Sequence, residues 1–221
     1  MMRGKIHLFI LLLSLSSLSC NAQNLTTMAN NPDINTDNIP ADQLEIATLG
    51  GGCFWCVEAI YQNIEGVYAV ESGYSGGSAA TANYKAVCSG ATKHAEVAQV
   101  RFNPQVVSYN DILEIFFSTH DPTTLNRQGN DVGPQYRSVV FYHSEEQKKM
   151  AEKLKSDYAP KIWDKPIVTE IAPLENYFPA EDYHQNYYEN VGNRNPYCTF
   201  VITPKVKKLQ RLFGDKLKDK Q

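Results

Sequence analysis

The segment Gly50-Gly-Gly-Cys53-Phe-Trp-Cys56 places two cysteines three positions apart, directly after three glycines. This spacing predicts a glycine turn followed by a helix that begins near Cys53. Free backbone N–H groups and the positive end of the helix dipole would then lie against the Cys53 thiol, and both lower a thiol pKa. We therefore expect Cys53 to act as a thiolate nucleophile. Cys56 lies one helical turn further on, within reach of a disulfide once Cys53 is oxidised.

Two other kinds of site share a Cys-x-x-Cys pattern. A structural zinc site normally needs two further ligands at a regular spacing. Cys88, His94 and Cys198 are scattered along the chain, so we expect no metal. A thiol–disulfide oxidoreductase that uses Cys53 and Cys56 stays open as an alternative function, although two large aromatic residues between the cysteines suit a ligand pocket better than an open docking surface. A non-catalytic binding module is the third possibility.

Glu96 is the second residue that could do chemistry. Residues 94–102 alternate as a strand does, and Glu96 shares its face with Ala98, Val100 and Phe102. A carboxylate on the apolar side of a strand is costly unless it is protonated or paired. Burial would raise its pKa into the range that a general acid needs near neutral pH. The alternative is a buried glutamate held by backbone or arginine donors.

The elements that must position these groups alternate between strand and helix patterns. Hydrophobic spacing and turn residues predict strands at 44–49, 67–74, 94–102, 138–143 and 167–172, and helices at 54–64, after Ser108 (with Asp111) and after Ser144 (with Gln147). Both serines begin a capping-box pattern. We expect an α+β fold, a single-domain two-layer α/β sandwich with a mixed sheet and a ferredoxin-like core. The long polar segments 75–88 and 120–137 are expected to be functional loops.

Composition narrows the class of protein. The 221 residues are 43% apolar and 20% charged, which indicates one globular domain and excludes general disorder. A net charge of −3 argues against a nucleic-acid binder driven by phosphate neutralisation. The 17 residues from 205 to 221 hold seven Lys or Arg and two acidic residues. We interpret 205–221 as a basic C-terminal helix or tail facing solvent, with contact to an anionic membrane as the alternative.

The first 23 residues have the pattern of an export signal. Arg3 and Lys5 precede a short apolar run, and small residues lead up to Cys20. This arrangement resembles a bacterial lipoprotein signal, in which Cys20 would be lipidated and anchor the chain at the membrane, facing the periplasm. Ordinary cleavage after Ala22 is the alternative. Residues 24–43 are expected to form a flexible tether, and 44–204 the catalytic domain.

Several motifs, in the same order along the chain, closely resemble the A-type peptide methionine sulfoxide reductases. The resemblance covers residues 44–204, and the motifs are Gly52 to Glu58, Gly73 to Gly77, Tyr84 to Gly90, His94-Ala-Glu96, His120-Asp-Pro122, Asn126 to Asp131, Gln135 to Ser138 and Ala180 to Gln185. It implies reduction of methionine S-sulfoxide, free or in proteins. It implies that Cys53 is the nucleophile and that Glu96 is the proton donor. Tyr84 and Tyr136 would hydrogen-bond the sulfoxide oxygen, and Asp131 would shape the polar side of the site. Phe54 and Trp55 would form the pocket for the substrate methyl group.

The same resemblance implies a cycle through thiols alone. Cys53 would become a sulfenic acid, a second cysteine would convert it to a disulfide, and a thioredoxin-type dithiol would reduce that disulfide. No metal or organic cofactor is implied, and we expect a monomer. Many relatives have glycine at the position of Cys56 and resolve with a cysteine near the C-terminus. This chain has both Cys56 and Cys198, so Cys56 is the favoured resolving residue and Cys198 the alternative. Cys88 is expected to be a buried, apolar and inert thiol.

Overall fold

The computed structural model describes residues 43–219. The expected export signal, its Cys20 and the expected tether up to residue 42 lie outside the described residues. Within the described part of the chain, no helix has the length and apolar character needed to cross a membrane.

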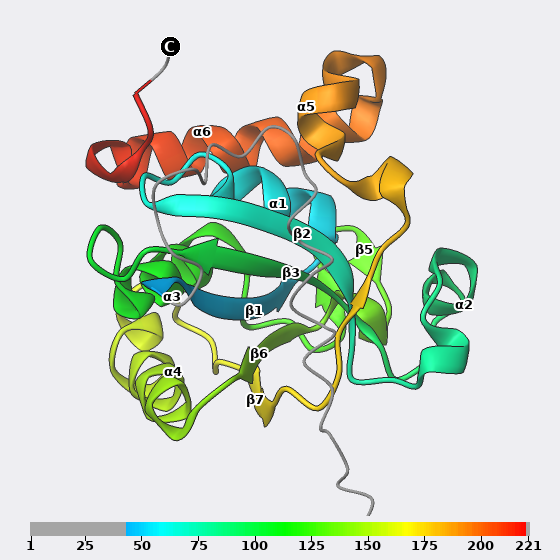
Figure 1. The fold of residues 1–221 in the computed structure, drawn as a ribbon, viewed down its shortest axis with the longest axis horizontal. Coiled ribbons are helices and arrows are strands. Elements are labelled where there is room, and N and C mark those ends of the chain that lie inside the picture. The colour runs from blue at the N-terminus through cyan, green and yellow to red at the C-terminus, as the bar shows by residue number, and fades with distance from the viewer. Residues whose placement is uncertain (1–42, 220–221) are drawn as a thin grey trace, which may run out of the picture. The chain divides into compact units, whose positions relative to one another are not determined.

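A six-stranded sheet forms the centre of the fold (Figure 1), with the strand order β7-β6-β1-β3-β2-β8. Its strands are β1 (Glu45–Gly51), β2 (Val67–Ser75), β3 (Ala95–Phe102), β6 (Ser138–Tyr142), β7 (Glu170–Pro173) and β8 (Phe178–Pro179). β6, β1, β3 and β2 are antiparallel neighbours, whereas β7 runs parallel to β6. The sheet is therefore mixed, and the order of its four central strands is that of a ferredoxin-like core, as the sequence predicted.

Helices cover one face of this sheet. The longer ones are α1 (Phe54–Tyr61), α3 (Tyr109–Thr119), α4 (Glu145–Asp157) and α6 (Thr203–Leu212), and the short ones are α2 (Tyr84–Cys88) and α5 (Tyr187–Val191). The four longer helices contribute to one core with apolar side chains of β1, β2, β3 and β6. On the opposite face, Val97, Val139 and Phe141 are covered by Leu174 and Tyr177. The result is the expected two-layer single domain.

The capping residues act at both predicted helix starts, but differently. At α3, Ser108 and Asp111 form the complete reciprocal capping box. At α4, Ser144 accepts the N–H of Gln147, whereas the Gln147 side chain accepts from His143 and donates to a β1 carbonyl. The longer glutamine side chain therefore joins the helix to the sheet instead of closing the second half of the box.

Several elements differ in length from the prediction. α1 ends at Tyr61 instead of residue 64, because the Asn63 side chain donates to the carbonyl of Ala59 and Ile64 forms a bridge with Leu217. β7 covers only 170–173. Both long polar segments contain short elements, which are a 3₁₀ turn and α2 in the first and a hairpin of β4 (Arg127–Gln128) and β5 (Asp131–Val132) in the second.

Candidate active site

Cys53 lies where β1 passes into α1. Gly52 makes the turn with φ of +96°, and a Cβ atom at this position would lie 2.5 Å from Cγ of Gln128. Glycine is therefore required both by the backbone angle and by the close approach of the β4 side chain. Cys53 is the N-cap residue of α1 and its side chain caps no N–H group. Cys53 is buried, with 7% of its surface exposed.

The two thiols titrate as a pair, and the expected lowering of the Cys53 pKa is wrong for the reduced protein. Burial raises the pKa of Cys53 well above its ordinary value, and the hydrogen bond with Cys56 and the charge of Glu96 raise it further. The N–H of Trp55 at the helix start lowers it, as expected, but burial is the larger effect. The hydrogen bond from Cys53 lowers the pKa of Cys56 to about 7. The first negative charge of the pair therefore forms on Cys56.

Glu96 lies beside this pair on the apolar face of β3, where the strand pattern placed it. It is 1% exposed, and one carboxyl oxygen accepts the N–H of Phe54 at 3.1 Å. Burial raises the pKa of Glu96 to about 8 against the lowering effects of that N–H group and of Cys53. Glu96 is therefore mostly protonated at neutral pH, within hydrogen-bonding range of the Cys53 thiol. A neutral acid is what proton donation requires.

Three further predicted residues surround this centre. Burial raises the pKa values of the Tyr84 and Tyr136 phenols, and the charges of Glu96 and Cys53 raise them further, so both remain proton donors. Asp131 accepts the phenol O–H of Tyr197 at 2.6 Å. The structure therefore brings together all five residues for which the sequence predicted catalytic roles.

Cys88 does not fit its predicted description. The residue is half-buried at the end of α2 and not enclosed in an apolar core. Its sulfur lies 4.0 Å from a Glu96 oxygen and contacts Tyr84 and Tyr136. The sequence missed this because α2 was read as part of an irregular loop, in which the direction of a side chain cannot be inferred.

Aromatic side chains form a wall beside Cys53. Trp55 stacks on Tyr187 with 3.7 Å between ring centroids, and Tyr197 approaches it edge-on. Phe54 is fully buried, with its ring 5.0 Å from His184. The two residues predicted to hold an apolar group thus lie next to Cys53 in the same cluster, with Phe54 buried and Trp55 half-buried.

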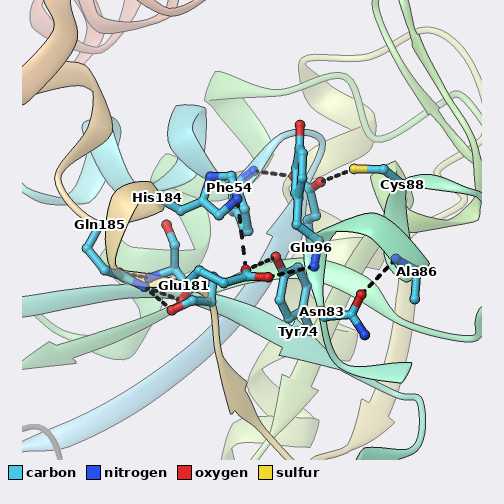
Figure 2. A network of polar contacts seen from close by, with 12 residues as sticks. Phe54, Tyr74, Asn83, Ala86, Cys88, Glu96, Glu181, His184 and Gln185 are labelled. Atoms are coloured by element: carbon cyan, nitrogen blue, oxygen red, sulfur yellow. Dashed lines mark hydrogen bonds and ion pairs between the residues drawn. The ribbon is translucent and has the colours of Figure 1, made fainter. Parts of the chain in front are cut away.

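A polar network that sequence reasoning missed holds this wall in place (Figure 2). The indole N–H of Trp55 donates to Nδ1 of His184. The Nε2 atom of His184 faces Glu181 at 3.9 Å. Glu181 also accepts the O–H of Tyr74 and the backbone N–H of Tyr84. This carboxylate therefore joins Tyr74 on β2 to the first residue of α2, next to the imidazole that accepts from Trp55. The only signal in the sequence was the matching motif that contains Glu181 and His184.

Glu58 provides a second support that the sequence did not single out. Its fully buried carboxyl accepts the backbone N–H groups of Asn186 and Tyr187, at 2.9 and 3.1 Å. Burial raises the pKa of Glu58 to about 7, against the lowering effect of both N–H groups. Since Tyr187 stacks on Trp55, Glu58 fixes the position of the wall from inside α1.

Both candidate resolving cysteines lie in the same apolar cluster as Cys53. Cys56 forms the hydrogen bond with Cys53 described above, and its sulfur is 3.9 Å from the Tyr197 phenol oxygen. Cys198 is fully buried, in the π-helical turn before α6, and burial together with the charge of Cys56 raises the pKa of its thiol. The geometry favours Cys56 as the thiol closest to Cys53. In residues 43–219, no group of three His, Cys, Asp or Glu side chains could hold a metal ion.

This arrangement offers a nucleophile and an acid to the two ends of one polarised bond. The Cys53 sulfur faces a neutral carboxyl group and two phenols, and an aromatic wall stands beside it. A sulfur–oxygen bond next to a small apolar group matches that pattern, since the sulfur would meet the thiol and the oxygen would meet the proton donors.

Comparisons with known proteins point to the same chemistry as the geometry of the site. The sequence model of the family "Peptide methionine sulfoxide reductase" matches residues 45–217. Peptide methionine sulfoxide reductase MsrA of Saccharolobus solfataricus is 54% identical over 175 residues, which cover 79% of this chain and 98% of that protein. MsrA of Trichodesmium erythraeum is 52% identical with the same coverage.

Solved structures show the same fold. Reduced Mxr1 from Saccharomyces cerevisiae superimposes with a TM-score of 0.65 at 38% identity, covering 71% of this chain and 90% of that one. Methionine sulfoxide reductase A of Corynebacterium diphtheriae gives a TM-score of 0.64 at 33% identity, with coverage of 67% and 75%. The chain therefore belongs to the peptide methionine sulfoxide reductase family and is an oxidoreductase that reduces the sulfoxide sulfur of methionine.

Proposed function

We propose that Cys53 reduces the S epimer of methionine sulfoxide, free or in oxidised proteins, with Glu96 as the proton donor. The observation that carries this proposal is the neutral Glu96 carboxyl, held by the Phe54 N–H group within hydrogen-bonding range of the buried Cys53 thiol. The choice of epimer follows from the family resemblance.

The first step transfers oxygen. The Cys53 proton passes to the Cys56 thiolate as the Cys53 sulfur attacks the sulfoxide sulfur, and Glu96 protonates the sulfoxide oxygen. The sulfoxide S–O bond breaks with transfer of the hydroxyl group, leaving methionine and a Cys53 sulfenic acid. Tyr84 and Tyr136 hydrogen-bond the oxygen as charge develops on it. Asp131, held by Tyr197, shapes the polar side of the site.

Substrate orientation depends on the aromatic wall. Trp55, stacked on Tyr187, and the buried Phe54 form the surface against which the methyl group of the substrate packs. With the methyl group there, the sulfoxide oxygen is directed towards Glu96 and the phenols. The same packing leaves the sulfur facing Cys53.

The second step forms a disulfide. The Cys56 sulfur attacks the Cys53 sulfenic sulfur and displaces the hydroxyl group, which leaves as water with the two protons first held by Cys53 and Glu96. A thioredoxin-type dithiol then reduces the Cys53–Cys56 bond. Cys56 is preferred to Cys198 because the Cys53 thiol already donates to it. Thiol chemistry alone completes this cycle, so neither a metal nor an organic cofactor has a step in it.

We also propose that the protein is exported as a monomeric lipoprotein that repairs oxidised proteins at the periplasmic face of a membrane. Support comes from the pattern of residues 1–23 and from the cysteine at position 20. Labelling with a radioactive fatty acid tests this. Incorporation into the wild type and its loss in Cys20→Ser is the expected result, and equal labelling of both would contradict it.

The catalytic proposal is tested with dithiothreitol as reductant and a peptide carrying either sulfoxide epimer. We expect turnover of the S epimer alone, no turnover by Cys53→Ser, and near wild-type turnover by Cys88→Ser, which removes a thiol from the same site. Reduction of insulin without turnover of either epimer would instead identify a thiol–disulfide oxidoreductase. Full activity in Cys53→Ser would refute Cys53 as the nucleophile, and the proposed mechanism with it.

A further inference from the structure

A small hollow of about 10 Å³, roughly the space of one water molecule, lies beside Cys56, and the aromatic wall contributes no residue to its lining. Side chains from α1 and α3 and a lysine of α6 line it. Val57, Ile60 and Phe116 make its surface mainly apolar, and Cys56 and Lys205 both border it. The sequence had placed Lys205 in a basic helix facing solvent. In the structure, α6 packs against α1 and α3, and Lys205 is half-buried at the hollow.

Lys205 is the one cation among the side chains that line this hollow. His120 also lines it, but both of its ring nitrogens are engaged, with the Phe116 carbonyl at 2.6 Å and the Ser138 hydroxyl at 2.7 Å. Burial lowers the pKa of His120 to about 3, so this imidazole is neutral at physiological pH. No ion pair found within residues 43–219 includes Lys205.

We propose that Lys205 is a positioning residue for disulfide formation, where its ammonium group holds Cys56 as a thiolate for attack on the oxidised Cys53. This inference rests on the proposed role of Cys56 as the resolving residue. A charge acts strongly across a mainly apolar hollow because few water molecules screen it.

The other groups around Cys56 explain why Lys205 matters at this step. In the reduced protein the hydrogen bond from Cys53 stabilises the Cys56 thiolate more than any other group does. Once Cys53 is a sulfenic acid, that thiol proton is gone. The groups that still favour the Cys56 thiolate are the phenol of Tyr197 and the charge of Lys205. Burial and the negative charges of Asp131, Glu96 and Cys198 disfavour it. Within residues 43–219, Lys205 is then the one positive charge among the groups that act on Cys56.

Single-turnover kinetics of Lys205→Met test the proposal. The wild type or variant is mixed with one equivalent of an S-sulfoxide peptide without reductant, and methionine formation and loss of the Cys56 thiol are followed separately. If the charge holds the thiolate, its loss raises the pKa that governs disulfide formation by about one unit. A thiol of higher pKa is less ionised but more nucleophilic as the thiolate. We therefore expect disulfide formation to be about threefold slower than in the wild type at pH 6 and about twofold faster at pH 9.

Matched variants separate charge from structure. Lys205→Arg keeps the charge and should follow the wild-type pH profile. Lys207→Met removes the same charge from an exposed neighbouring position and should give a rate ratio near one at every pH. Methionine formation, the first step, should be unchanged in Lys205→Arg and Lys207→Met. In Lys205→Met it should change less than disulfide formation does, because the hydrogen bond from Cys53 still stabilises the Cys56 thiolate at that step. The inference would be overturned if the rate of disulfide formation in Lys205→Met, relative to the wild type, did not change with pH. It would also be overturned if Lys207→Met showed the same change with pH as Lys205→Met.

One more variant separates failure of this inference from failure of its premise. In Cys56→Ser, the Cys53 sulfenic acid should persist and be trapped by a dimedone probe. If a Cys53–Cys198 disulfide forms instead at the wild-type rate, Cys56 is not the resolving residue and both proposals fall. If Cys56 is essential but the pH ratio of Lys205→Met is flat, only the role of Lys205 is refuted.

Discussion

Replacing Glu96 by glutamine should make the protein more stable and much less active. Glutamine has nearly the same shape, and its carbonyl oxygen can still accept the N–H of Phe54, so the fold of α1 is preserved. The side chain has no proton to give to the sulfoxide oxygen. We expect Glu96→Gln to slow methionine formation by about 10²-fold or more, the range for loss of a general acid.

The gain in stability follows from the raised pKa. Below pH 4.5 the Glu96 carboxyl is protonated in both the folded and unfolded chain, and it contributes no pH dependence. Between 4.5 and about 8 it ionises only when the chain unfolds, so the folded state loses stability as pH rises. At roughly 1.4 kcal/mol for each pH unit, this amounts to about 3 kcal/mol at pH 7. Glu96→Gln removes that loss.

Chemical denaturation at pH 4.5 and pH 7 measures this effect. The difference in free energy of unfolding between Glu96→Gln and the wild type should grow by about 3 kcal/mol from the lower to the higher pH. Wild-type methionine formation should also decline as pH rises through about 8, where Glu96 loses its proton, and the variant should lack this decline. Glu71→Gln, a carboxyl change on β2 at a position paired with Gln99, serves as the control for activity.

Activity of Glu96→Gln within fivefold of the wild type would refute the role of Glu96 as proton donor. An unchanged stability difference between the two pH values would refute the neutral state of the buried carboxyl. The two measurements are independent, because activity reports proton donation and stability reports the protonation state of the buried carboxyl.

Two further predictions concern the support of the site. Gly52→Ala should lower the free energy of unfolding by about 2 kcal/mol or more, because the added methyl group meets Gln128 in a backbone conformation that alanine adopts poorly. Gly214→Ala has open space around the added methyl group and should leave the free energy of unfolding nearly unchanged in the same denaturation experiment. Glu58→Gln should raise KM for a sulfoxide peptide more than it lowers kcat, because an amide cannot accept both N–H groups as the carboxyl does and Tyr187 would loosen against the wall; a fall in kcat with unchanged KM would contradict this.

Much of the fold could be predicted from local patterns. The strands at 67–74 and 94–102 and the capped helix after Ser108 follow from alternation and capping, which depend on neighbouring residues. The second capping box formed only in part, since the side chain of Gln147 found a partner on β1, a distant strand. A hydrogen bond to a distant strand cannot be predicted from the residues around Gln147.

The active site, like the fold, could be predicted from the sequence only where it depends on local patterns. Strand parity predicted the buried face for Glu96, and the glycine turn predicted the position of Cys53 at the start of a helix. The pKa order of the two thiols could not be predicted, because burial and the hydrogen bond to Cys56 depend on the packed site. The supporting roles of Glu181 and Glu58 arise from contacts between residues about 100 or more positions apart, beyond any local pattern.

Disulfide mapping after one turnover tests the central claim most directly. The reduced protein is mixed with one equivalent of an S-sulfoxide peptide without reductant, the remaining thiols are blocked, and the digested protein is analysed by mass spectrometry. We predict one methionine formed for each chain, a Cys53–Cys56 disulfide, and free thiols at Cys88 and Cys198. Methionine formation with Cys53 still free would contradict the role of Cys53, and a Cys53–Cys198 bond would contradict the role of Cys56.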